Sequence, residues 1–145
     1  MKSLTIAPAI ALLLALPASP TGARAESQAA VEITFDVGAK TGSVKAALYD
    51  SRIGYDSRKP LRTLNIPANG RNVVARFEGL KPGTYAVQAF HDLNGDGRLN
   101  TNLVGYPIEP FAFSNNAPPR VGPAPWSAAA FEVGAKGAAQ TLTIR

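Results

Sequence analysis

One segment of the chain spaces its oxygen-bearing side chains in the manner of a calcium loop. Asp92, Asn94 and Asp96 alternate along it and Gly97 follows, which matches the front of an EF-hand loop, D-x-[DN]-x-[DN]-G. Calcium takes about six to eight hard oxygen ligands, and a tight turn brings several of them to one point. The segment therefore predicts a calcium site, with calcium as the cofactor and these metal ligands: Asp92, Asn94, Asp96, the carbonyl of Arg98, Asn100 through a water molecule, and Glu109.

The segment departs from an EF-hand in two respects. Leu103 stands where the bidentate glutamate of an EF-hand belongs, and a predicted strand, not a helix, leads into the loop. We therefore expect a calcium loop on a β scaffold, in which Glu109 is the only downstream carboxylate close enough in sequence to supply the missing oxygens. The alternative is a plain turn, because Asp, Asn and Gly tolerate left-handed geometry and bond their own backbone in any loop.

Residues for catalysis are few. The chain has no cysteine, and His91 is its single histidine. The neighbouring Asp92 would point to the other face of a strand, so a serine triad lacks its carboxylate. We predict a non-enzymatic protein with no catalytic residues. The alternative is a metal-dependent hydrolase that uses the clustered acids Asp92, Asp96 and Glu109.

Aromatic residues are concentrated around a long Pro/Asn/Gly-rich excursion that follows the calcium-type segment. Stacking rings interspersed with amides would suit a sugar or an extended peptide. The candidate ligand-binding residues are Tyr106, Phe111, Phe113 and Trp126, with the amides of Asn115 and Asn116 between them. The alternative is that these rings form a satellite core that pins the long loop to the domain.

The elements that must position these residues are predicted to be strands. Apolar residues recur with a period of two, which is typical of half-buried strands. Strands are expected at 31–37, 43–49 and 61–66, through 73–77, at 84–91, near 131 and at 140–144, with a loop at 50–60 and a possible short helix at 124–130. The turn Lys81-Pro82-Gly83 predicts that the strands on either side of it pair as a hairpin.

This pattern favours an all-β fold. About seven strands, short turns and one long loop predict a single antiparallel β-sandwich of immunoglobulin-like or transthyretin-like kind over residues 26–145. A chain of that length can bury a core without disulfides.

The first 25 residues predict export. Lys2 precedes an apolar run, and Ala23-Arg24-Ala25 is an A-x-A cleavage site, so we expect a signal peptide at 1–25 and a periplasmic or secreted product. No membrane span is expected after cleavage. The formal net charge is only +5, and the basic residues form no face interleaved with aromatics, which argues against nucleic acid as a partner. An envelope protein or a glycan is the expected partner.

Two ordered motifs carry a resemblance to a known family. The first is His91-Asp92-Leu93-Asn94-Gly95-Asp96-Gly97, and the second runs from Gly105-Tyr106-Pro107-Ile108-Glu109 to Phe113-Ser114-Asn115-Asn116. Together they resemble the exported bacterial family catalogued as domain of unknown function 2141, over essentially the whole chain after the signal peptide. The resemblance implies a periplasmic or secreted β domain and no particular activity. Asn100 departs from the family, which commonly carries Asp there.

Overall fold

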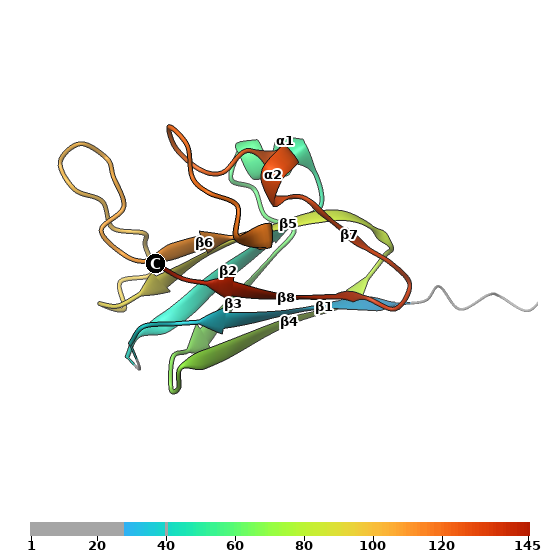
Figure 1. Ribbon diagram of the computed structural model, residues 1–145, viewed down its shortest axis with the longest axis horizontal. Helices are drawn as coiled ribbons and strands as arrows, with labels where there is room; N and C mark the ends of the chain where they lie inside the picture. The colour runs from blue at the N-terminus through green and yellow to red at the C-terminus, as the bar shows by residue number, and fades with distance from the viewer. Residues whose placement is uncertain (1–27, 40) are drawn as a thin grey trace, which may run out of the picture.

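The chain folds as two β-sheets that pack face to face (Figure 1). The computed structural model describes residues 28–39 and 41–145, so the predicted signal peptide lies outside the described residues. The described part is mostly β, as the period-two pattern predicts. It forms eight strands where about seven were expected, because residues 111–113, in the segment expected as a long loop, form a short strand.

Three strands make the smaller sheet, in the order β4-β1-β8. They are β1 (Ala29–Asp36), β4 (Asn72–Leu80) and β8 (Ala138–Thr143). β1 lies in the middle, antiparallel to β4 and parallel to β8.

The larger sheet has five strands, and all its pairings are antiparallel. Its members are β2 (Ser43–Tyr49), β3 (Arg62–Pro67), β5 (Gly83–Asp92), β6 (Phe111–Phe113) and β7 (Phe131–Val133). The order is β3-β2-β5-β6, and β7 pairs with the beginning of β5. β5 is thus the central strand from which the candidate site begins.

The main core lies between the sheets. Val31, Ile33 and Phe35 alternate with partly exposed residues along β1, and they meet Leu48 and Val87 from the larger sheet. Burial of these alternate side chains removes apolar surface from water and holds the layers together. An antiparallel sandwich is confirmed, apart from the parallel β1–β8 pair.

A second, smaller core covers the outer face of the larger sheet. There α1 (Arg52–Asp56) and α2 (Trp126–Ala129) pack on side chains of β2, β5 and β6, and the 3-10 helix η1 (Ser114–Asn116) follows β6. Figure 1 shows both α-helices on that side. α2 lies within the predicted helix at 124–130. The prediction of a loop throughout 50–60 is wrong at α1, where Ser51 accepts a hydrogen bond from Gly54 N at 3.2 Å and caps the helix.

The hairpin predicted around Pro82 is also wrong. β4 and β5 follow each other in the chain, yet β4 pairs with β1 in one sheet and β5 with β2 in the other. β4 and β5 both place every second side chain in the core between the sheets. Two strands of a hairpin would show the same alternation of apolar and polar residues, so the pattern cannot tell the two arrangements apart. The Lys81 carbonyl accepts a hydrogen bond from the Tyr85 hydroxyl at 2.9 Å, which fixes the turn as the chain crosses between sheets.

Candidate functional site

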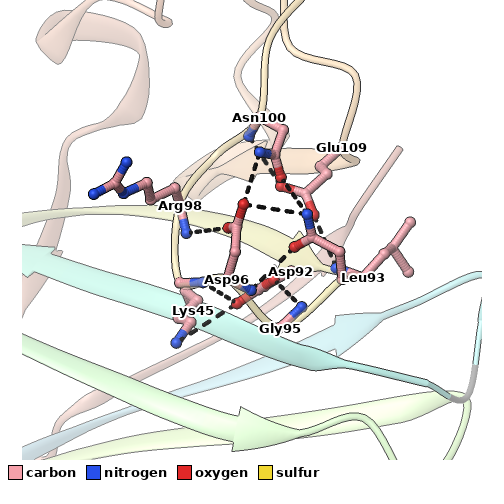
Figure 2. Close-up of polar contacts among 10 residues, drawn as sticks. Lys45, Asp92, Leu93, Gly95, Asp96, Arg98, Asn100 and Glu109 are labelled. Atoms are coloured by element: carbon pink, nitrogen blue, oxygen red, sulfur yellow. Dashed lines mark hydrogen bonds and ion pairs between the residues drawn. The ribbon is translucent and has the colours of Figure 1, made fainter.

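The candidate site begins where β5 ends, at Asp92. The carboxylate of Asp92 is fully buried, and its two oxygens accept hydrogen bonds from the loop that follows (Figure 2). Oδ1 accepts from Gly95 N at 2.7 Å, and Oδ2 accepts from Gly97 N at 2.9 Å. Both glycines have positive φ, 77° and 80°, a conformation that few other residues adopt without strain. Asp92 therefore organises the turn.

A lysine from the neighbouring strand supports this buried acid. Lys45 lies on β2, which pairs with β5, and its Nζ is 3.7 Å from Asp92 Oδ2. An opposite charge at this distance offsets part of the cost of burying a carboxylate. The sequence analysis missed Lys45, since a partner across two strands leaves no signal in local spacing.

Glu109 returns to the same loop from its far end. Its carboxylate, which is 7% exposed, accepts from Leu93 N at 2.9 Å and from Asn100 N at 3.0 Å. The chain returns at Glu109 to the loop that Asp92 begins. One carboxylate thus joins the beginning of the loop to its eighth residue, and we call residues 93–108 the anchored loop.

A polar trio lies on the exposed part of the anchored loop. Asp96 Oδ2 accepts from Asn100 Nδ2 at 2.9 Å and from Asn94 Nδ2 at 3.2 Å, while Asp96 Oδ1 accepts from Arg98 N at 2.8 Å. The hydrogen bond from Asn100 is the main cause that holds the pKa of Asp96 below its usual value. Figure 2 shows the Arg98 guanidinium pointing away from these oxygens.

The predicted calcium ligands are thus brought into one loop, where they bond to its N–H groups. Asp92 and Asp96 accept from different sets of donors. Over residues 28–39 and 41–145, no group of three or more His, Cys, Asp or Glu side chains is arranged as a metal site requires. Carboxylate oxygens have further lone pairs to offer a cation, so calcium binding here stays a prediction.

His91 is buried at the end of β5. Its Nε2 lies 2.6 Å from the carbonyl oxygen of Thr41, and the ring is 1% exposed. Within the described part of the chain, no carboxylate is hydrogen-bonded to the imidazole. The ring therefore serves the packing of the strand end.

The four candidate ligand-binding rings do not lie together. Phe113 packs edge-to-face on Phe111, with ring centroids 5.7 Å apart, and Trp126 packs on Tyr55 at 5.6 Å. These three rings belong to the second core or lie against it, as the satellite-core alternative predicts. Tyr106 is 61% exposed on the anchored loop.

The side chains of Asn115 and Asn116 form hydrogen bonds with backbone groups of the domain itself. Asn115 Nδ2 donates to Ala128 O and Ala130 O, at 3.0 and 2.9 Å. Asn116 Nδ2 donates to Thr141 O, and its Oδ1 accepts from Thr143 N, each at 2.9 Å. They fasten η1 to α2 and β8, a role that the sequence analysis did not foresee.

Several large apolar side chains are exposed to solvent, and the sequence did not predict this exposure. Leu103 and Val104 at the tip of the anchored loop are 107% and 87% exposed, and Ile108, later in the same loop, is also exposed. Val121, on the loop between η1 and α2, is 109% exposed. From sequence alone, apolar residues in a loop could equally be part of the core. Only the fold shows that these side chains face solvent.

The fold and the site define a class: an all-β sandwich whose central strand ends in a loop held by buried carboxylates. Residues 31–141 match the family described as an uncharacterized protein conserved in bacteria (DUF2141), and the chain belongs to that family. None of the curated proteins compared with the chain matches it. No helix in the described residues is long and apolar enough to cross a membrane.

Proposed function

We propose that the chain is an exported, non-enzymatic module of the cell envelope that binds another envelope component through the anchored loop. One observation carries this proposal: the acids of the loop serve its own backbone, while its apolar side chains face solvent. A loop that is costly to deform and exposes apolar residues suits recognition, because little ordering is needed on binding.

The hydrogen bonds of two acids favour a non-enzymatic role over hydrolysis. Asp92 and Glu109 are buried, and each of their oxygens already accepts a backbone N–H. A general acid or base needs a carboxyl group that can reach its substrate. Export is supported by the A-x-A site after the apolar run, which directs the product to the periplasm or the medium.

The proposal is tested by site-specific photo-crosslinking in the cells that export the chain. A benzophenone side chain replaces Leu103 at the tip of the anchored loop, and a matched control replaces Val74, which is exposed on β4 in the other sheet. The intact mass of the recovered product should correspond to a chain that begins at Glu26. Adducts at position 103 that are absent at position 74 are the expected result. The same low yield at both positions would contradict the proposal.

A further inference from the structure

Two loops carry exposed apolar side chains at their tips. Leu103 and Val104 are followed by the exposed Tyr106 on the anchored loop. Val121 stands on a second loop, residues 117–123, which we call the proline loop because it contains Pro118, Pro119 and Pro123. Figure 1 shows both loops, in orange tones, rising from the side of the larger sheet that α1 and α2 cover. On this side α1 exposes Ile53 to 83%.

Four backbone N–H groups at the tip of the anchored loop are bonded within the loop. Asn102 N donates to Tyr106 O at 2.8 Å, and Gly105 N donates to Asn102 O at 2.9 Å. The side-chain oxygen of Asn102 accepts from Val104 N and Tyr106 N, at 3.1 and 2.9 Å. A segment with its N–H groups bonded internally loses little when water is removed from around it.

The proline loop also has few free backbone N–H groups, for a different reason. Its three prolines have no N–H to satisfy, and Arg120 N donates to Gly122 O at 3.1 Å across the tip. Both tips can therefore leave water without stranding many polar groups.

The exposed charges of the two loops are mostly basic. The anchored loop carries Arg98 and one acid, Asp96, whose carboxylate accepts hydrogen bonds from within the loop, and residues 117–123 contain Arg120 and no acid. Both arginines are exposed, and neither forms an ion pair with any residue that the structure describes. Apolar tips beside exposed arginines are complementary to a surface of anionic headgroups over hydrocarbon.

The shape of this surface favours lipid over a protein partner. A stable protein interface buries about 800 Å² on each partner, whereas these side chains stand on separate projecting tips. A fluid bilayer accepts separate tips without a matching surface, and a tyrosine beside the apolar pair is typical of residues at the headgroup level.

We propose that this face is a membrane-docking surface, in which Leu103, Val104 and Val121 enter an anionic lipid interface and Arg98 and Arg120 contact its headgroups. The inference rests on the proposed binding role of the anchored loop and names its partner class. The chain lies on the membrane in this arrangement.

The test measures partition of the exported form of the chain onto vesicles of phosphatidylcholine, with and without phosphatidylglycerol. Binding should require phosphatidylglycerol and weaken with added salt. Leu103→Ser with Val104→Ser should lower the partition coefficient at least about tenfold, and Arg98→Gln or Arg120→Gln should each lower it about fivefold. The matched control Val74→Ser should bind as the wild type does. All five positions are exposed, so the variants should keep the wild-type melting temperature.

A second measurement reports insertion directly. Because the chain has no cysteine, Leu103→Cys and Val74→Cys each give a single site for an environment-sensitive fluorophore. Emission should shift to the blue with phosphatidylglycerol vesicles at position 103 only. Vesicle binding that the tip substitutions leave unchanged would overturn the inference. Failure to bind vesicles together with protein adducts at position 103 in cells would overturn the lipid partner and leave the binding module standing. Failure of both would remove the proposed function as well.

Discussion

Asp92 and Glu109 accept hydrogen bonds from the backbone of one and the same loop. Glu109 takes the N–H groups of Leu93 and Asn100, and Asp92 takes those of Gly95 and Gly97 between them. None of the buried side-chain nitrogen and oxygen atoms of the described residues lacks a partner. Two acids at opposite ends of the loop thus act as one anchor, and substituting either should loosen the whole segment.

Replacing Glu109 by glutamine tests the anchor. Glu109→Gln removes one acceptor and sets an N–H₂ group against a backbone N–H, so we expect a loss of about 1.5–3 kcal/mol in the free energy of unfolding, the value of a hydrogen bond to a charged group. Chemical denaturation measures this loss, and amide exchange at Asn100 should accelerate. The control Glu78→Gln, on an exposed residue of β4, should stay close to wild type. Equal stability of the two variants would contradict the anchoring role.

The two aromatic residues Trp126 and Tyr106 should behave in opposite ways. Trp126→Ala removes a ring that packs on Tyr55 and is partly buried, so about 3 kcal/mol of stability should be lost. Tyr106→Ala removes a ring that is mostly in water, and a change within about 0.5 kcal/mol is expected. Denaturant titration of both variants gives the comparison. A stable Trp126→Ala variant would return Trp126 to the set of ligand-binding candidates.

Acid should release the polar trio of the anchored loop. The pKa of Asp96 is lowered in the folded chain from the ordinary value of 3.8, chiefly by the hydrogen bond from Asn100. The contribution of the charged form is therefore complete above pH 3.8 and is lost as the pH falls through the lower, folded pKa. Nuclear magnetic resonance titration of the Asp96 carboxyl carbon and the Arg98 amide should show this step. A midpoint above 3.8 would contradict it.

Calcium binding should raise the stability of the folded chain by a measurable amount. At ~2 mM calcium and a Kd of ~0.1 mM, binding to the folded state alone adds about 1.8 kcal/mol. The melting temperature should then rise by roughly 5–10 °C over a chelator control. Asp96→Ala should remove most of the rise, and magnesium should do much less, since it requires octahedral geometry. A melting temperature that calcium leaves unchanged would assign the stability of the loop to its hydrogen bonds alone.

We predict that the chain has no enzymatic activity. A broad screen of ester, glycoside and phosphate substrates should stay at background, because Asp92 and Glu109 are buried and occupied and His91 contacts a carbonyl. Activity above background that disappears in both His91→Ala and Asp96→Ala would identify a site among these residues.

Much of the fold follows from the sequence because burial on one face of a strand leaves a period of two. β2 was predicted at its observed bounds for this reason. The pairing of β4 with β1 could not be predicted, because alternation tells which side of a strand is buried and not which strand lies next to it.

The residues of the candidate site also fall into those that local sequence could indicate and those that it could not. Asp92, Asp96 and Glu109 were recognised because loop chemistry is local, and Glu109 had only a short distance to return. Lys45 approaches across strands, and Asn116 bonds to β8, so both depend on contacts that spacing does not encode. The exposure of Leu103 was equally hidden, because hydropathy alone cannot tell an outward apolar residue from a buried one.

The parallel pairing of β1 with β8 has a consequence for the order in which the smaller sheet forms. β1 is the middle strand of its sheet, and one of its two neighbours is the strand that follows all the others. The smaller sheet is therefore incomplete until the last strand of the chain is available to pair with β1. Because contacts between distant parts of a chain form slowly, we expect this pairing to be a late step in folding.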